Sequence, residues 1–215
     1  MKLATLLAAV LAFSSASVAQ AGQNHQPRSK AGVFDYYVLN LSWAPEYCKT
    51  HADDTAECGS SQPGFVLHGL WPQYSKSGYP SSCASQQKLD ADALALGRTV
   101  FPSEKLVTHE WQKHGTCSGL TAMAYIQAAD TAHKSVTIPA ILQPGKNQRS
   151  LALANITQAV LDANPALNRQ SLAIVCTGGE LSEVEVCLSK DLKPTSCGRD
   201  VSNKCGATVT LLGVQ

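Results

Sequence analysis

The 215-residue chain lacks the features that define several large protein classes. No two cysteines form a Cys-x-x-Cys pair, which argues against a zinc ribbon and a thioredoxin-like redox motif. No apolar run reaches the length of about 20 residues that crosses a bilayer. The formal net charge is only +1, which argues against a basic scaffold that coats nucleic acid, because such affinity comes largely from neutralising phosphates. There is no internal repeat and no low-complexity segment, so one globular domain is expected.

The first residues have the pattern of an export signal. Met1-Lys2 supplies a charged start, the run from Leu3 to Phe13 is apolar, and Ala19-Gln20-Ala21 matches a cleavage site with small residues. We therefore interpret residues 1–21 as a signal peptide cleaved after Ala21, and residues 22–215 as one domain of a secreted or periplasmic protein. The leader carries one Lys and no acid, so its removal leaves a net charge of about zero.

Cysteine, in contrast, is plentiful. In an exported chain an even count of eight predicts a domain stapled by four disulfides. On the order of 100 pairings are possible, so the spacing alone does not select one. The cysteines are Cys48, Cys58, Cys83, Cys117, Cys176, Cys187, Cys197 and Cys205.

Hydrophobic periodicity predicts strands toward both ends of the chain and helices in the middle. The expected strands are residues 34–43, 65–68, 171–176, 181–188 and 207–212. The expected helices are residues 103–115, 121–134 and 150–164, with a weaker one near 89–100. The last three strands suggest an antiparallel meander, since Gly178-Gly179 separates the first two of them. The pattern predicts an α+β domain, a central antiparallel sheet with several helices packed against it.

The densest group of reactive side chains lies in residues 109–117, His-Glu-Trp-Gln-Lys-His-Gly-Thr-Cys. If this stretch is helical, Glu110, Lys113 and His114 share one face, because the last two follow the first by three and four residues. His109 lies at the edge of that face. An acid, a cation and imidazoles on one patch are the groups that proton transfer around an anionic intermediate requires.

Two other interpretations of this stretch are weighed against catalysis. A zinc-binding helix needs His-Glu-x-x-His, whereas His109 and His114 diverge by roughly 140° on a helix of 3.6 residues per turn, which is wrong for a shared ion. The other is a solvated helix face, the usual meaning of such a cluster of Glu and Lys.

A second stretch, residues 64–73, reads Gly-Phe-Val-Leu-His-Gly-Leu-Trp-Pro-Gln. His68 ends the short apolar strand, and the Gly, Trp and Pro that follow predict a turn of the backbone beside an aromatic face. A histidine at the end of an apolar strand is more often a core residue with satisfied hydrogen bonds. His68 alone therefore does not indicate catalysis.

Together, the segments Phe-x-Leu-His-Gly-Leu-Trp-Pro and His-Glu-Trp-x-Lys-His-Gly-Thr-Cys resemble the two active-site segments of the ribonuclease T2 family of secreted acid ribonucleases. Both match nearly residue for residue and in the right order. Residues 34–43 also resemble the first strand of that family. The resemblance is to bacterial periplasmic members of the ribonuclease I type, and it implies their α+β fold.

The resemblance implies an endoribonuclease that cleaves single-stranded RNA without a metal or cofactor. His114 is then the general base toward the 2′-hydroxyl and His68 the general acid toward the departing 5′-oxygen. Glu110 and Lys113 stabilise the charged phosphorane, and His109 helps to bind phosphate. The products are a 2′,3′-cyclic phosphate and, more slowly, a 3′-phosphate. DNA has no 2′-hydroxyl and resists cleavage. A monomer that does not associate with membranes is expected.

Base recognition is less defined. Trp71 and Tyr79 are placed to stack on bases. The alternative interpretation of Trp71 is an ordinary aromatic residue of the core. Many family members have an acidic residue two positions after this tryptophan. This chain has Gln73 there, so we expect broad base specificity. Trp111 is expected to pack the catalytic helix on the sheet.

The resemblance also implies how the cysteines pair. One disulfide would tie the two active-site segments together, two would be nested in the tail, and one would close a short polar loop. The implied pairs are Cys83–Cys117, Cys176–Cys205, Cys187–Cys197 and Cys48–Cys58.

Two further function classes are weighed against the ribonuclease. A metal-dependent hydrolase would use His109, His114 and Glu110, and it would lose activity in EDTA. A binding module built on an inactive ribonuclease scaffold normally lacks a catalytic histidine, whereas His68 and His114 are both present here.

Overall fold

The computed structural model describes residues 29–59, 63–84 and 86–214, so the predicted signal peptide lies outside the described residues. The strands are β1 (Tyr36–Trp43), β2 (Phe65–Gln73), β3 (Arg149–Ala152), β4 (Leu172–Thr177), β5 (Glu180–Leu188) and β6 (Thr208–Leu211). The α-helices are α1 (Ala44–Tyr47), α2 (Thr55–Cys58), α3 (Ala91–Val100), α4 (Glu104–Lys113), α5 (Ala122–Lys134) and α6 (Leu153–Ala163). Within these residues, no helix combines the length and the apolar character needed to cross a membrane.

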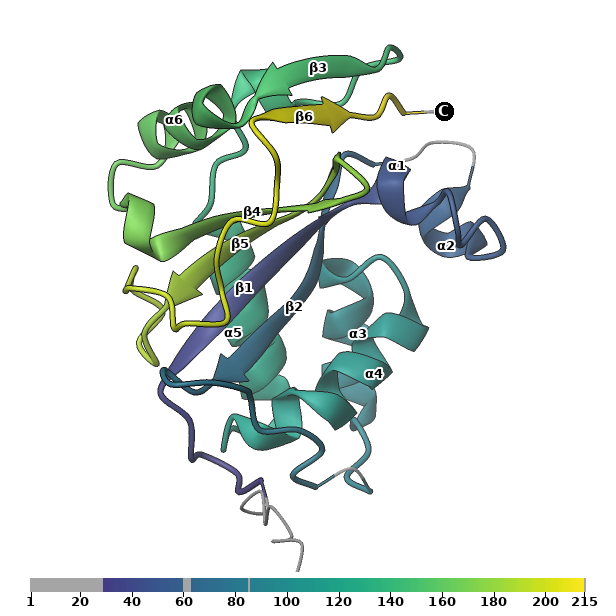
Figure 1. The fold of residues 1–215 in the computed structure, drawn as a ribbon. Coiled ribbons are helices and arrows are strands. Elements are labelled where there is room, and N and C mark those ends of the chain that lie inside the picture. The colour runs from purple at the N-terminus through teal and green to yellow at the C-terminus, as the bar shows by residue number, and fades with distance from the viewer. Residues whose placement is uncertain (1–28, 60–62, 85, 215) are drawn as a thin grey trace, which may run out of the picture.

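The strands form one six-stranded sheet in the order β2-β1-β5-β6-β3, with β4 also paired to β5. The pairs are antiparallel except for β5 with β6, whose parallel contact is limited to Glu180 opposite Thr210. In Figure 1, β1, β2, β4 and β5 make up the long twisted part, and β3 and β6 lie beside it next to α6. The predicted α+β class is confirmed, and the sheet is mixed only through that one contact.

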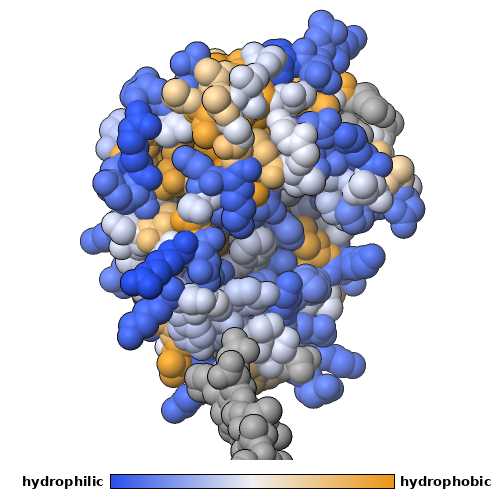
Figure 2. Space-filling view, viewed as in Figure 1, coloured by the Kyte–Doolittle hydropathy of each residue, from blue (hydrophilic) through white to orange (hydrophobic). Residues whose placement is uncertain are grey.

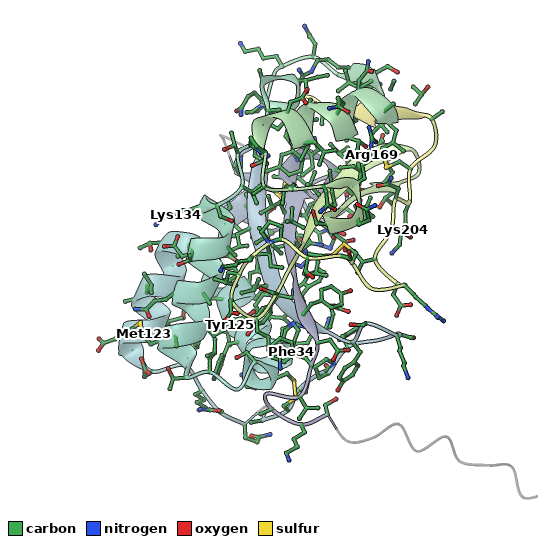
Figure 3. All side chains as sticks on the ribbon, turned by 90° about the vertical axis from the view of Figure 1, so that its left-hand side faces the viewer. Phe34, Met123, Tyr125, Lys134, Arg169 and Lys204 are labelled. Atoms are coloured by element: carbon green, nitrogen blue, oxygen red, sulfur yellow. A yellow bond between two sulfur atoms is a disulfide. The ribbon has the colours of Figure 1, made fainter. Side chains whose placement is uncertain are left out.

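The main core lies between the sheet and α5. Leu39 and Leu41 of β1 are buried there together with Ile126 and Tyr125 of α5. Figure 3 shows Tyr125 between α5 and the sheet, and its hydroxyl donates a hydrogen bond of 3.0 Å to the carbonyl of Leu70 in β2. This contact fixes α5 against the edge strand β2.

The opposite face of the sheet carries polar side chains. Asn40 and Ser42 of β1 and Glu183 and Glu185 of β5 lie on this side, because the residues that alternate with them fill the core. This face is turned toward the viewer in Figures 1 and 2, where it is largely hydrophilic. The sheet therefore separates the main apolar core from a face that combines these polar side chains with a small second apolar cluster of Tyr36, Val38 and Cys187.

A β-bulge at His68 sets the direction of the side chains in β2. The register passes from Asn40 opposite Gly69 to Leu41 opposite Leu67, so His68 is the extra residue. A bulge re-aims side chains and is frequent near active sites. Here it allows apolar residues on both sides of it to face the core while His68 stays on the polar face.

Strand β2 is longer than predicted. The sequence predicts a strand over residues 65–68 and a turn after His68, because Gly69 and Pro72 are poor strand residues. The strand instead continues to Gln73. It is an edge strand, where a proline need not remove a ladder hydrogen bond, and the bulge lets the chain continue past Gly69.

Two further predictions are wrong in part. The helix expected over residues 150–164 begins only at Leu153, because residues 149–152 form β3. The expected meander holds for β4 and β5, but β6 pairs antiparallel with β3 rather than continuing the hairpin. Both errors have one cause: the pairing of β3 with β6 joins segments more than 50 residues apart in the chain, which local periodicity does not reveal.

Four disulfides join the described cysteines, and they are the pairs that the resemblance implies. Cys83–Cys117 spans 34 residues and ties the loop after β2 to the turn after α4. Cys48–Cys58 spans only 10 residues and closes the loop that contains α2.

The difference in loop length predicts a difference in stability. Replacing Cys83 and Cys117 by serine should lower the free energy of unfolding by about 1 kcal/mol more than replacing Cys48 and Cys58, because the longer closed loop restricts the unfolded chain more. Urea unfolding of the two double variants followed by circular dichroism measures this. A larger loss for the Cys48–Cys58 variant would contradict it.

Candidate active site

Helix α4 presents the predicted catalytic face. It begins after Ser103, whose hydroxyl accepts a hydrogen bond from the Leu106 amide, and it buries Glu110 and Trp111. His114 is the C-cap residue, and its amide donates to the Glu110 carbonyl at 2.9 Å. Glu110 is 1% and His114 3% exposed. The helix thus places the acid and the imidazole together and largely out of water.

The fully buried Trp111 anchors this helix. Its indole N–H donates a hydrogen bond of 2.9 Å to the Gln87 carbonyl, and its ring packs against Tyr125 of α5. The side chain is therefore part of the core, as the sequence predicts.

Trp71 of β2 joins the two predicted segments. Its indole N–H donates a hydrogen bond of 2.6 Å to Oε2 of Glu110. The His114 ring stacks on the indole with centroids 5.2 Å apart, and the His68 ring meets it edge-on at 5.0 Å. Both imidazoles therefore contact one indole. Since His114 occupies one face of Trp71, a base could stack only on the other.

Gly69 makes the close approach of β2 to α4 possible. A Cβ atom at this position would collide with Oε2 of Glu110 and with the indole nitrogen of Trp71. The residue after His68 must therefore be glycine for α4 to lie this close to β2.

The two imidazoles have opposite electrostatic environments. Burial, followed by the positive charges of Lys113 and His109, lowers the pKa of His114 to about 3. Burial also opposes the charged form of His68, but Glu183, Glu110 and Glu57 outweigh it and raise the pKa of His68 above its usual value. His114 is therefore neutral and His68 protonated in mildly acidic solution.

Glu110 is an unusual carboxyl group. Burial raises its pKa to about 7, although His68, the Trp71 hydrogen bond and Lys113 each act in the opposite direction. Its Oε1 lies 4.0 Å from Nε2 of His68. Near neutral pH this group can be protonated and can donate a hydrogen bond.

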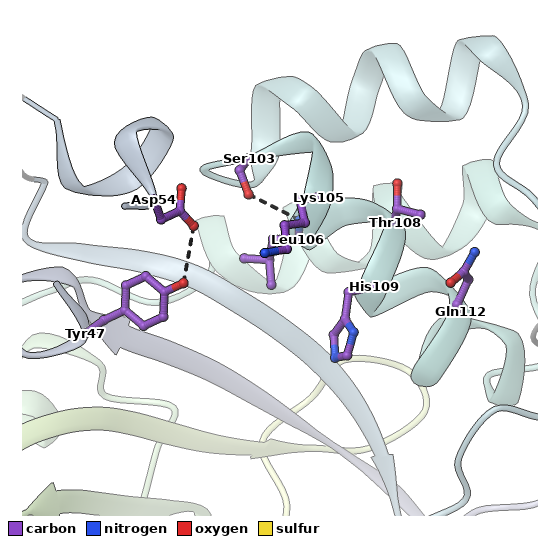
Figure 4. Close-up of a pocket in the computed structure, with 8 residues that line it drawn as sticks. All are labelled: Tyr47, Asp54, Ser103, Lys105, Leu106, Thr108, His109 and Gln112. Atoms are coloured by element: carbon purple, nitrogen blue, oxygen red, sulfur yellow. Dashed lines mark hydrogen bonds between the residues drawn. The ribbon is translucent and has the colours of Figure 1, made fainter. Parts of the chain in front are cut away.

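His109 lines a pocket of about 280 Å³ between α4 and the loop closed by Cys48–Cys58 (Figure 4). Burial, then the charges of Lys113 and His68, lowers the pKa of His109. The pocket walls include Tyr47, whose hydroxyl donates a hydrogen bond of 3.2 Å to Asp54.

A smaller pocket of about 110 Å³ adjoins it and reaches His68. The two pockets share Tyr47, Asp54 and Leu106, so they are neighbours, and together they are called the groove between His109 and His68. The smaller pocket also contains Glu57, a buried acid whose pKa burial raises to about 6. The sequence analysis did not identify this wall, because residues 48–63 read simply as a polar loop.

The predicted base-binding residues lie at the other end of the site. Tyr79 is 45% exposed, and its ring centroid is 5.7 Å from that of His114. Gln73 is buried at the end of β2, where strand alternation places its side chain on the same face as Trp71. Lys113 is half-buried beside them at the end of α4. All eight predicted catalytic and substrate-binding residues therefore lie on β2, α4 or the segments that follow them.

Glu183 of β5 is a further residue of the site that no sequence motif marks, and its Oε1 is 3.8 Å from Nδ1 of His68. Within the described part of the chain, no group of three or more His, Cys, Asp or Glu side chains is placed to hold a metal ion.

Comparisons with known proteins agree with this geometry. A ribonuclease from Aeromonas hydrophila is 47% identical over 130 residues, which are 60% of this chain and 55% of that protein. A probable ribonuclease from Haemophilus influenzae is 33% identical over 133 residues, 55% of this chain and 47% of that protein. The chain spans about half the length of these two relatives.

Solved structures share the fold. RNase NT in complex with 5′-AMP superposes with a TM-score of 0.62 at 26% identity, covering 83% of this chain and 98% of that one. An RNase-related protein from Calystegia sepium gives 0.67 at 22% identity, covering 82% and 96%.

The sequence profile of the Ribonuclease T2 family matches residues 34–197. This range includes both β2 and α4, and hence His68, Trp71, Glu110 and His114. It also makes up well over half of the sequence, and on this match the chain belongs to the ribonuclease T2 family.

Proposed function

We propose that this protein is an endoribonuclease that cleaves single-stranded RNA with broad base specificity, through a 2′,3′-cyclic phosphate to a 3′-phosphate and without a metal ion. The observation that carries the proposal is the pair of imidazoles at Trp71, one with a lowered and one with a raised pKa. This difference lets a neutral base and a protonated acid coexist at the same pH, the states in which such a pair acts. RNA supplies its own nucleophile, the 2′-hydroxyl, so no nucleophilic side chain is required.

The pKa shifts support one assignment of roles. His114 is neutral and accepts the proton of the 2′-hydroxyl as that oxygen attacks phosphorus. His68 is protonated and donates its proton to the 5′-oxygen as the phosphorus–oxygen bond breaks. DNA has no 2′-hydroxyl and is not a substrate in this mechanism.

Glu110 and Lys113 act on the charge that develops at phosphorus. A buried carboxylate would repel an anionic phosphorane, but the pKa of about 7 leaves Glu110 partly protonated and able to donate a hydrogen bond. Lys113 adds a positive charge, and His109 adds a donor to phosphate at the mouth of the groove. Preorganised donors in a site with little water stabilise such a state strongly.

The position of the general acid orients the RNA. Because His68 protonates the departing oxygen, the leaving nucleotide lies on the side of the groove that contains Glu57 and Leu106. The nucleotide that keeps the phosphate lies toward Trp71 and Tyr79, whose rings offer stacking that tolerates any base.

We also propose that the protein is exported as a monomer. The leader pattern in residues 1–21 and the four disulfides support export, because disulfides persist mainly in oxidising compartments.

The first test measures cleavage of bulk RNA and of single-stranded DNA in EDTA. We expect RNA to be cleaved to cyclic phosphates and DNA to stay intact. His68→Ala and His114→Ala should each lower kcat/KM by roughly 10²–10⁴-fold, the usual contribution of an acid or a base. His133→Ala on α5 is the control and should keep full activity. Loss of wild-type activity in EDTA that zinc restores would favour a metal-dependent hydrolase instead.

The second test is the pH profile of kcat/KM. Because the base must be neutral and the acid protonated, activity should rise through the low pKa of His114, about 3, and fall above the raised pKa of His68, with loss of the Glu110 proton near pH 7 adding to the fall. Lys113→Met should shift the acidic limb to higher pH, since Lys113 lowers the pKa of His114. Circular dichroism at each pH restricts the fit to folded protein. An acidic limb that stays in place in Lys113→Met would contradict the assignment of His114 as base.

A further inference from the structure

Glu183 lies on β5, two strands away from His68, and yet the two side chains meet. Strand β1 runs between them, with Ser42 opposite Glu183 on one side and opposite Val66 on the other. Only the small side chains of Ser42 and Asn40 occupy this stretch of the polar face of β1. The carboxylate of Glu183 can therefore reach across β1 to the bulge at His68.

The His68 ring is held between two acids. Its Nδ1 is 3.8 Å from Oε1 of Glu183, and its Nε2 is 4.0 Å from Oε1 of Glu110. Glu110 belongs to the reaction site through Trp71, so Nε2 faces the substrate. Nδ1 faces away from it, toward β5. This leaves Glu183 on the side of the ring that takes no part in proton transfer.

We propose that Glu183 is the positioning residue of the general acid: it accepts the Nδ1–H of His68, so that the transferable proton stays on Nε2 and points at the departing 5′-oxygen. This inference rests on the proposed function and assigns to β5 a role in the same reaction. A carboxylate fixes the tautomer and orientation of an imidazole in the same way in other acid–base catalysts.

Two neighbouring acids on β5, Glu183 and Glu185, differ in their pKa values. The nearby polar side chains of His68 and Asn40 and the charge of Lys204 outweigh burial and lower the pKa of Glu183. Figure 3 shows Lys204 on the side of the sheet away from α5. Burial, followed by repulsion from Glu183, raises the pKa of Glu185 to about 7. In mild acid, therefore, Glu183 carries the negative charge and Glu185 does not.

The titration of His68 depends on groups from three elements. Glu183 faces it from β5, Glu110 from α4 and Glu57 from α2, and all three favour its charged form. His109 of α4 and His114 at its C-terminal end also lie near enough to His68 for its charge to influence the pKa of each. Removal of the Glu183 charge alone should lower the pKa of His68, because Glu183 is the largest of the favourable influences.

The test compares Glu183→Gln with Glu180→Gln in the full chain. Both acids lie on β5, both side chains are 24% exposed, and both are ion-paired, Glu180 with Lys49. The comparison isolates contact with His68 from the general loss of a charge on this strand. Glu183→Asp keeps the charge on a shorter side chain and serves as the rescue variant.

The first measurement is the NMR titration of the imidazole of His68 in the free protein, which needs no substrate. We expect Glu183→Gln to lower the pKa of His68 and to mix its tautomers, whereas Glu180→Gln leaves both unchanged. An unchanged pKa and tautomer in Glu183→Gln would overturn the proposal. An inert wild type would instead refute the proposed function, and the titration would still decide what Glu183 does to His68.

The second measurement compares two substrates. With RNA, Glu183→Gln should lower kcat/KM about tenfold, a part of what a general acid contributes, with little change in KM and with the alkaline limb moved to lower pH. Glu183→Asp should recover most of this activity. With a nucleoside 3′-(4-nitrophenyl phosphate) the loss should disappear, because nitrophenolate leaves without being protonated. Equal losses on both substrates would mean that Glu183 acts only on the fold.

Discussion

The hydrogen bond from the indole of Trp71 to the carboxyl group of Glu110 is the contact on which the site depends. It joins the edge strand β2 to α4, and it places a nearly inaccessible acid beside two imidazoles. It requires Gly69, because any side chain there would occupy the space of both partners. The fold is arranged around this contact: α5 supports β2 from the core side, and Cys83–Cys117 holds the end of α4.

The charged and polar groups around this contact set the protonation states of the two imidazoles. On the polar face, His68 lies among acids that favour its protonated form, while burial, followed by the charges of Lys113 and His109, keeps His114 neutral. These two environments adjoin the same indole ring, that of Trp71, which both imidazoles contact. The same burial that costs stability for each ionisable group thus sets the protonation states that the proposed transphosphorylation needs. The β-bulge contributes here, because it keeps His68 on the polar face while Leu67 and Leu70 on either side of it both face the core.

The sequence was informative wherever local pattern and chemistry coincide. The alternation of residues 34–43 predicted β1, the helical spacing around Glu110 predicted α4, and the two histidine motifs predicted the pair of imidazoles that meets at Trp71. It failed where partners are distant in the chain. Strand β3 exists because β6 lies beside it, and β2 continues beyond His68 because it lies at the edge of the sheet. The groove wall from residues 47–57 also forms only when that loop folds against α4.

The sequence by itself determined the fold class, the family resemblance and the side chains that carry the proposed chemistry, because these follow from residue types at short, fixed spacings. The tertiary structure decided which imidazole is charged. That difference depends on burial and on charges brought from α2, α4 and β5, segments separated by up to more than half of the chain. Glu183 illustrates the reason: nothing near it in sequence marks it as functional, and only the pairing of β5 with β1 brings it to His68.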